Sequence, residues 1–257
     1  MKIITCFKVV PEEQDIAIKA DGELSFDRAK PTISAYDLNG VEAGAQLLEE
    51  CGGELIALSA GAGSIDSPKL KKNILSRGPG SLAMVADDRL QGLDTHQTAE
   101  VLKAAIEKIG EYDLILCGEG SSDLYAQQVG PQLGQLLNIP AINAISKITA
   151  ADGKIVVQRT LENEVETLEI TLPALVTVTT DINLPRIATM NHILAAGKKP
   201  STVWALEDIG IPEPPRTIEV IDTRAPRQVE RKQDIVEGDT DDAIQEVISK
   251  LSAVLAK

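Results

Sequence analysis

The sequence predicts an α/β protein in which helices cover both faces of a mostly parallel β-sheet. Short, nearly continuous apolar runs alternate along the chain with segments whose apolar residues recur every three or four positions. Continuous apolar runs are typical of strands that are buried on both faces, and the three-to-four spacing is typical of helices with one buried face. The alternation of the two favours parallel strands joined by helical crossovers.

Five apolar runs are expected to form strands of this sheet. They are residues 3–10 (IITCFKVV), 54–59 (ELIALS), 82–86 (LAMVA), 114–117 (LILC) and 174–179 (ALVTVT). Ligands of parallel sheets bind beyond the carboxyl ends of the strands. We therefore expect a binding site in the loops that follow Val10, Ser59 and Cys117.

Three segments between these strands are expected to be helices. They are residues 37–50, 95–109 and 126–137. In the second of them Ala99, Leu102, Ile106 and Ile109 form one apolar stripe, as an amphipathic helix requires. The threonine at its start is a suitable helix cap.

The later part of the chain departs from this alternation. Residues 154–170 predict a β-hairpin, in which KIVVQRTL and VETLEI flank the polar turn 162–164. After Trp204 the chain is rich in proline, which predicts an extended arm. Residues 241–256 have apolar residues at helical spacing and predict a terminal helix that docks on its own domain or on a partner. We therefore expect a domain at 1–205 and an arm with a terminal helix at 206–257.

Composition excludes several functional classes. Asp and Glu total 39 against 25 Lys and Arg, for a net charge of -14, which argues against a nucleic-acid surface. No apolar run is long enough to predict membrane insertion. The three cysteines are far apart and there are two histidines, so neither a metal site nor a disulfide is expected. The start of the chain does not resemble a secretory signal, and a cytoplasmic location is expected.

Two glycine-containing loops are candidates for a phosphate site. Residues 118–130 (GEGSSDLYAQQVG) follow a buried strand and lead into a helix, where glycines and unpaired N–H groups favour an anion. Residues 59–64 (SAGAGS) also follow a strand. Taken alone, each loop is better explained as an ordinary strand-to-helix turn. The two loops together with the turn at residues 6–11 favour a shared nucleotide cleft. Lys8, near the end of the first strand, is a candidate for a phosphate contact or a solvated surface lysine.

No arrangement of residues predicts catalysis. The chain has no Gly-x-Ser-x-Gly elbow, no HExxH and no P-loop lysine motif. We therefore assign no catalytic residue and expect a binding or carrier protein, not an enzyme. Residues 180–194 are unusual for a loop because they are rich in apolar side chains, which suggests either a protein-binding surface or a short helix packed beneath its own loop.

Four segments carry a resemblance to a known family. They are residues 2–15 (KIITCFKVVPEEQD), 34–39 (SAYDLN), 118–132 (GEGSSDLYAQQVGPQ) and 171–199 (TLPALVTVTTDINLPRIATMNHILAAGKK). In this order they resemble the β subunit of electron transfer flavoproteins. Among its branches the chain is most similar to the FixA type, which is linked to carnitine or anaerobic acyl-CoA metabolism.

The resemblance implies a Rossmann-like core and two cofactor sites. An α subunit would hold most of the redox-active FAD, and the β subunit would bind AMP or a second FAD. By position, the nucleotide contacts would come from Cys6, Ser34, Ala35, Tyr36, Asp37, Ser59, Ala60, Gly61, Gly118, Gly120, Ser121, Ser122, Asp123, Gln127, Gln128 and Val129. Tyr36 would also lie near the flavin of the α subunit.

The resemblance also implies two protein partners. Residues 183–199 match a recognition loop for an acyl-CoA-type dehydrogenase, and its contacts would come from Arg186, Met190, Ile193 and Leu194. The arm and terminal helix match a tail that wraps onto the α subunit. Two other interpretations are a free-standing adenine-nucleotide-binding protein of the universal stress protein type, and a nucleotide hydrolase or ligase. The length and the long arm fit the first poorly, and the missing P-loop disfavours the second.

Overall fold

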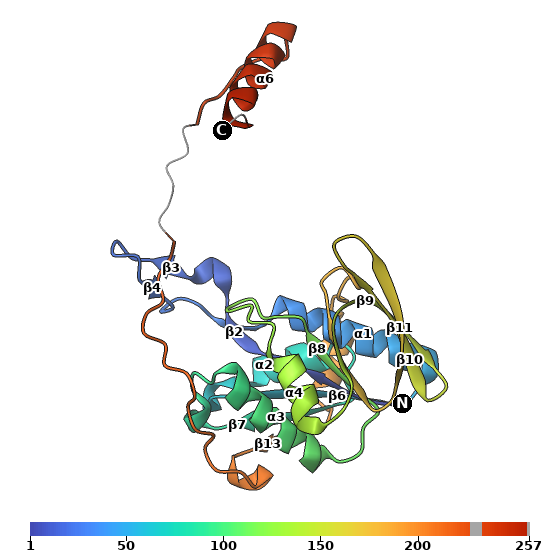
Figure 1. The fold of residues 1–257 in the computed structure, drawn as a ribbon. Helices are drawn as coiled ribbons and strands as arrows, with labels where there is room; N and C mark the ends of the chain where they lie inside the picture. The colour runs from blue at the N-terminus through green and yellow to red at the C-terminus, as the bar shows by residue number, and fades with distance from the viewer. Residues whose placement is uncertain (227–232, 256–257) are drawn as a thin grey trace.

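The computed structural model describes residues 1–226 and 233–255 and has a nine-stranded central sheet in the order β11-β10-β9-β12-β8-β1-β6-β7-β13 (Figure 1). Its strands are β1 Lys2–Cys6, β6 Glu54–Gly61, β7 Ser81–Ala86, β8 Leu114–Gly118, β9 Ala141–Ala151, β10 Lys154–Thr160, β11 Val165–Thr171, β12 Ala174–Val178 and β13 Ser201–Trp204. Seven neighbouring strands run parallel to one another: β9, β12, β8, β1, β6, β7 and β13. At one end of the sheet β10 pairs antiparallel with β9, and β11 pairs antiparallel with β10. The predicted Rossmann-like α/β class is confirmed.

Four of the five predicted apolar runs form the predicted strands, but the first run is shorter than expected. Residues 3–10 do not form one strand, because β1 ends at Cys6 and the chain turns at Phe7 and Lys8. The amide of Phe7 still bonds to Leu58 O at 2.9 Å, whereas the amide of Lys8 bonds to the Asp37 carboxylate at 2.7 Å. This change of partner bends the backbone away from the sheet. The first binding loop therefore follows Cys6 and not Val10.

The bend places a small β-layer beside the main sheet. Strand β2 (Val9–Pro11) pairs antiparallel with β5 (Pro31–Ile33), and β3 (Ala17–Ile18) pairs with β4 (Leu24–Ser25). Short 3-10 turns lie at Glu13–Asp15, Gly63–Ile65, Asp88–Leu90 and Glu207–Ile209.

Helices cover both faces of the sheet, as predicted. They are α1 Ala35–Cys51, α2 Pro68–Leu75, α3 Thr95–Ile109, α4 Val129–Leu137, α5 Met190–Ala196 and α6 Asp241–Leu255. Side chains of α3 and α4 pack with one face, which includes Ile4, and those of α1 pack with the other, which includes Ile3. Successive residues of a strand point to opposite faces, so adjacent isoleucines of β1 enter different cores.

Helix α3 has the predicted bounds, but α4 begins three residues later than the predicted 126. Asp94, and not the expected Thr95, caps α3: its carboxylate accepts the Gln97 amide hydrogen at 2.8 Å, and the Gln97 side chain accepts the Asp94 amide hydrogen at 3.1 Å. Before α4, Tyr125 and Gln127 have positive φ angles of 46° and 58°, which an α-helix does not accept. Those two residues keep 125–128 outside the helix.

The predicted hairpin is confirmed, and a third strand extends it. β10 and β11 pair antiparallel from Lys154↔Thr171 to Thr160↔Val165. The additional strand β9 pairs antiparallel with β10 and parallel with β12, so it connects the hairpin to the main sheet. Figure 1 shows this three-stranded end rising beside α1.

The arm runs along the body before the terminal helix. Leu206 is fully buried in the core that α3 covers, and Ile209 and Ile211 pack against it. Further on, the Ala225 amide bonds to Gly22 O at 2.9 Å. The arm residues 227–232 lie outside the described residues, as does Ala256, the last residue of the predicted helix. In α6 the apolar stripe is exposed, and Figure 1 shows this helix clear of the sheet.

Candidate functional site

Three strand ends predicted to carry binding loops are neighbours in the sheet. β8, β1 and β6 lie side by side and parallel, with Thr5 opposite Leu116 on one side and Cys6 opposite Leu58 on the other. The loops that follow them therefore emerge at the same edge. β6 and β7 add to one side of β1, and the chain then returns to place β8 on the other side. Parallel sheets tend to bind ligands beyond the strand ends at such a reversal. We call this place, between the ends of β1 and β8, the crevice.

Asp37 joins the two loops that border this crevice. It lies in the first turn of α1, is buried, and accepts the backbone amides of Lys8 at 2.7 Å and Gly118 at 3.2 Å. Burial raises the pKa of the Asp37 carboxyl to about 7, although the two amide hydrogen bonds and the nearby Lys8 charge act in the opposite direction. Its carboxyl group thus holds the end of β1, the end of β8 and the start of α1 together.

An ion pair crosses the crevice. The Lys8 ammonium lies 2.6 Å from the Asp123 carboxylate, which also accepts a 2.5 Å hydrogen bond from the Ser121 hydroxyl. Burial opposes ionisation of Asp123, but these hydrogen bonds outweigh it and lower its pKa. The charge of Lys8, which the sequence suggested for a phosphate, is thus paired with a carboxylate of the opposite loop.

Serine side chains connect the same loop to the start of α1. The Ala35 amide donates to Ser122 Oγ at 3.2 Å, and the Ser122 amide donates to Ser34 Oγ at 3.4 Å. With Asp37, these contacts bring residues 34–37 against residues 118–123. Both segments were predicted to contribute to one nucleotide site, and the structure places them together.

Close backbone approach explains the glycines of this loop. A Cβ on Gly118 would lie 2.6 Å from Asp37 Oδ1 and 2.8 Å from the carbonyl carbon of Tyr36. A Cβ on Gly120 would lie 2.4 Å from the Tyr125 ring. Tyr125 in turn packs against Tyr36, with ring centroids 5.0 Å apart. The glycines therefore allow α1 and the tyrosine pair to approach the end of β8.

The far side of the crevice is the start of α4. Gln128 is its N-cap residue and makes no side-chain cap, while Gln128 Oε1 accepts a hydrogen bond from Thr95 Oγ1 at 3.0 Å. An uncapped helix N-terminus presents N–H donors and positive partial charge. Gln127 is exposed, Val129 is partly buried, and both stand next to these donors.

The β6 loop contributes backbone and not the Ser59 hydroxyl. Ser59 is fully buried, and its Oγ has no hydrogen-bond partner among the described residues. Ala60 and Gly61 are partly exposed at the edge, where Gly61 O accepts the Asp87 amide at 3.0 Å. Of the three nucleotide contacts predicted in this loop, Ser59 is buried, and Ala60 and Gly61 lie at the edge of the sheet where the strands end.

Two cysteines that are distant in sequence are neighbours beneath the crevice. Cys6 ends β1 and Cys117 lies near the end of the adjacent β8, and both are buried. The hydrogen bond with Cys6, together with burial, raises the pKa of the Cys117 thiol. Cys6 was predicted to touch the nucleotide, and its position at the strand end is compatible with this contact.

The donors of the crevice suit a ligand that carries phosphate. They comprise the ammonium of Lys8, the hydroxyls of Ser121 and Ser122, the amide groups of Gln127 and Gln128, and the N–H groups at the start of α4. Glycines at positions 118 and 120 let backbone come close. A phosphate at this place would compete with Asp123 for the Lys8 charge.

The predicted partner-binding residues lie in a separate segment, which we call the apolar loop (residues 184–194). Met190, Ile193 and Leu194 are 70%, 39% and 66% exposed on the short helix α5. The sequence did not single out Leu184 and Ile187, which are 89% and 88% exposed. Arg186 differs from all of these, because its guanidinium contacts Glu42 and Glu49 of α1.

Metal ligands and membrane-spanning helices can be assessed for the described parts of the chain. Within residues 1–226 and 233–255, no three His, Cys, Asp or Glu side chains are placed to hold a metal ion. None of the helices in these ranges is long and apolar enough to cross a membrane.

Comparison with protein families identifies the chain. Residues 23–209 match the family model described as the electron transfer flavoprotein domain. The match extends from β4 to the 3-10 turn Glu207–Ile209, and therefore includes α1, the loop after β8 and the apolar loop. It covers well over half of the 257 residues. The chain therefore belongs to the electron transfer flavoprotein family.

Proposed function

We propose that the chain is the β-type subunit of a heterodimeric electron transfer flavoprotein, of the FixA-type branch. In this role it passes electrons between an acyl-CoA-type dehydrogenase and another redox partner. The family match over residues 23–209 supports an electron transfer flavoprotein, and the resemblance of residues 34–39 and 171–199 to β subunits supports the choice of subunit. This match does not favour the alternative of a free-standing adenine-nucleotide-binding protein. FAD, held largely by the α subunit, would supply the redox chemistry.

The crevice between β1 and β8 is the proposed site of the second nucleotide, AMP or a second FAD. Adjacent loops, an uncapped helix start and close-approach glycines support a phosphate there. In this proposal Lys8 and the serines bind the phosphate, and Asp37 holds the loops in position. Tyr36 faces the flavin of the α subunit.

Unpartnered apolar surface supports assembly with other proteins. The apolar loop is proposed to bind the dehydrogenase. The stripe of α6 is proposed to bind the α subunit, because Ile248 and Leu251 are 48% and 56% exposed. We assign no catalytic residue to this chain and place the assembled protein in the cytoplasm.

Cofactor counting tests this proposal. The chain would be co-expressed with a candidate α subunit, the complex purified and then denatured, and the FAD and AMP released per heterodimer measured. One FAD and one AMP indicate a simple carrier, and two FAD without AMP indicate the bifurcating type. A colourless monomer that releases neither nucleotide and does not bind the α subunit would refute the proposal.

A further inference from the structure

Residues of α1 fix the backbone at one end of the apolar loop. Asn39 Nδ2 donates to Asn183 O at 2.9 Å, and Asn183 Nδ2 donates back to Asn39 O at 3.0 Å. Asn39 is buried and Asn183 is half-buried, so these two bonds are partly shielded from water. They set the position of the chain immediately before Leu184.

Three residues further along α1, Glu42 forms an ion pair and several hydrogen bonds with Arg186. Its carboxylate accepts Arg186 Nε at 2.7 Å, Arg186 Nη2 at 3.0 Å and the Arg186 backbone amide at 3.1 Å. A two-point contact between carboxylate and guanidinium fixes orientation as well as distance. Because the same carboxylate also holds the backbone amide, it constrains the chain and not only the side chain.

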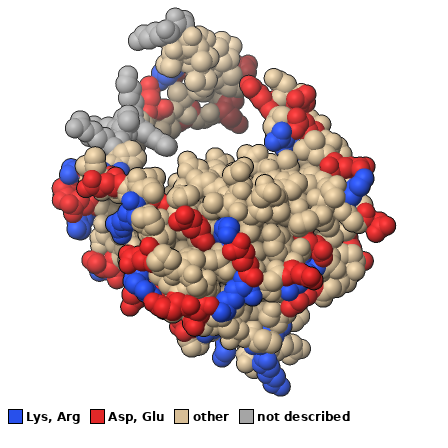
Figure 2. All heavy atoms as spheres, turned by 60° about the horizontal axis from the view of Figure 1, so that its bottom comes forward, with Lys and Arg blue, Asp and Glu red and all other residues tan. Residues whose placement is uncertain are grey.

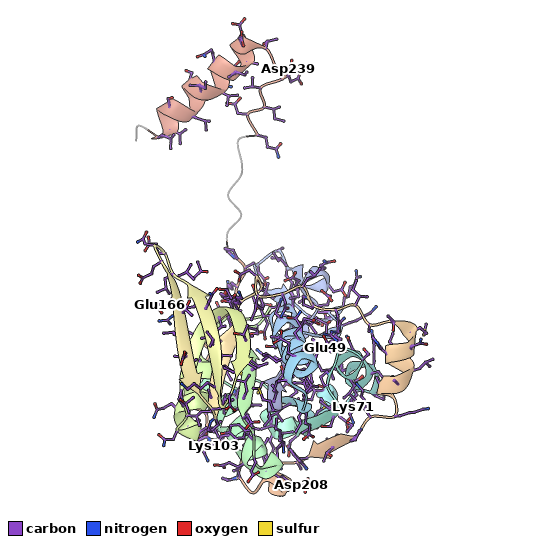
Figure 3. All side chains as sticks on the ribbon, turned by 90° about the vertical axis from the view of Figure 1, so that its right-hand side faces the viewer. Glu49, Lys71, Lys103, Glu166, Asp208 and Asp239 are labelled. Carbon is purple, nitrogen blue, oxygen red and sulfur yellow. The ribbon has the colours of Figure 1, made fainter. Side chains whose placement is uncertain are left out.

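The ion pair between Glu42 and Arg186 is largely shielded from solvent. The Glu42 side chain is 6% exposed and the Arg186 side chain 28% exposed. Burial alone would raise the pKa of Glu42, but the hydrogen bonds from Arg186 outweigh it and lower that pKa. Glu49, which Figure 3 labels on α1, pairs with Arg186 Nη1 at 2.8 Å but is 64% exposed. An exposed pair of that kind contributes little.

Further contacts hold the loop against α2. Arg77 Nη1 donates to Arg186 O at 2.7 Å. Beyond α5, the Lys199 ammonium donates to Leu75 O at 2.7 Å and Pro79 O at 2.6 Å. The apolar loop is therefore fixed at both ends, and its most exposed apolar side chains lie between the two attachments.

We infer that Glu42 and Arg186 are positioning residues, which hold the apolar loop ready to dock on the redox partner without themselves forming the docking surface. The guanidinium of Arg186 is engaged by α1, while Leu184, Ile187 and Met190 point their apolar surface to solvent. Ordering a loop at the moment of binding costs free energy, and a loop fixed beforehand avoids that cost. This inference rests on the proposed function for its partner, but its structural part can be tested without one.

Hydrogen exchange of the full chain tests the structural part. In Glu42→Gln the amides of residues 184–194 should exchange about tenfold faster than in the wild type, while those of β1, β6 and β8 stay unchanged. Glu49→Gln should change exchange about twofold or less. Glu50→Gln is the matched control, since Glu50 lies on the same helix, is exposed and forms no ion pair with the described residues. Unchanged exchange of 184–194 in Glu42→Gln would overturn the inference.

Kinetics test the link to the partner. With the heterodimer as substrate of an acyl-CoA dehydrogenase, Glu42→Gln should raise KM for the heterodimer about tenfold, or about 1.4 kcal/mol, with kcat unchanged. Combined with Met190→Ala, its effect should be less than additive, because both changes impair the same docking contact. Full additivity, or a fall in kcat with KM unchanged, would contradict a positioning role.

A second variant tests the same inference in case Glu42→Gln folds poorly. Arg186→Lys keeps the charge but loses the two-point contact, so it should show the same exchange and the same change in KM. If the wild-type heterodimer accepts no electrons from any acyl-CoA dehydrogenase, the proposed function fails. The exchange experiment still decides whether Glu42 and Arg186 position the loop.

Discussion

Asp37 links the ionisation state of one carboxyl group to the stability of the fold. Its pKa is raised by burial from 3.8 to about 7, so between these values the folded protein keeps a proton that the unfolded chain has lost. The resulting stabilisation is complete below the lower value and is lost as the pH rises through about 7. A shift of this size corresponds to on the order of 4 kcal/mol.

We predict that Asp37→Asn removes this dependence. The free energy of unfolding of the wild type, measured by urea denaturation, should fall relative to that of Asp37→Asn as the pH rises from about 4 to about 8. Taking the difference between the two proteins cancels the contribution of other carboxylates, such as Asp123, whose lowered pKa acts in the opposite sense. A difference that is constant with pH would show that Asp37 is ionised throughout.

Gly118 and Gly40 provide a matched pair of glycine substitutions on the two sides of the contact between α1 and β8. At Gly118 a Cβ would meet α1 backbone at 2.8 Å, whereas at Gly40 the nearest atom would be 3.6 Å away. We predict that Gly118→Ala lowers the free energy of unfolding by about 1–3 kcal/mol. Gly40→Ala, inside a helix, should be neutral or raise it by up to about 1 kcal/mol. Thermal and urea denaturation of both variants would show whether the crevice depends on this close approach.

At the scale of elements, strands with continuous apolar sequence were predictable and polar or irregular elements were not. Helix α2 (PKLKKNIL) was missed because its lysines obscure the buried residues Leu70, Ile74 and Leu75. Strand β9 was missed because it alternates poorly, contains Ala144 at a φ of 58° and pairs with β10 through a register shift. Burial of such elements depends on partners that are distant in sequence.

The site was predictable as a set of loops but not as a set of contacts. The order of strands and helices was enough to place the ends of β1, β6 and β8 at one edge. It was not enough to show that Asp123 takes the charge of Lys8 or that Ser59 points into the core. The first depends on a contact between residues 115 positions apart, and the second on which way one side chain of β6 points, and the sequence contains no local signal for either.

Helix α6 is amphipathic, and nothing in the described structure buries its apolar stripe. Ile244, Val247, Ile248 and Leu251 are each at least 41% exposed. We predict that Leu251→Asp weakens binding of the α subunit about a hundredfold, or about 2.7 kcal/mol, because a charge would enter an apolar interface. The melting temperature of the isolated chain should stay unchanged, since the Leu251 side chain is 56% exposed among the described residues.

Ser249→Asp is the control for this helix, because Ser249 lies off the stripe. It adds the same charge and should leave binding within about twofold of the wild type. Titration of the α subunit with each variant, followed by calorimetry or fluorescence, gives the affinities. Equal weakening by both variants would attribute the effect to net charge and not to the stripe.

At the scale of the whole molecule, charged side chains surround an uncharged area on one face (Figure 2). The net charge is -14, and Figure 2 shows acidic and basic side chains interspersed around a broad uncharged area on one face. The apolar loop and α6 add exposed apolar surface from segments distant in sequence. A body with a complete core that also exposes several apolar segments is expected to function in an assembly.

The apolar loop and α6 are proposed to bind different proteins, and a substitution at Met190 separates these two contacts. Met190 is 70% exposed on α5, so Met190→Ala removes little packing within the chain and should leave both the melting temperature and the heterodimer intact. If the apolar loop is the dehydrogenase contact, removal of this side chain should lower kcat/KM for electron transfer about tenfold or more. Val165→Ala is the control, because Val165 is also apolar and is 60% exposed but lies in the hairpin. This change should have no effect on electron transfer. Loss of the heterodimer in Met190→Ala would instead assign the loop to the α subunit, and unchanged electron transfer would show that docking occurs elsewhere.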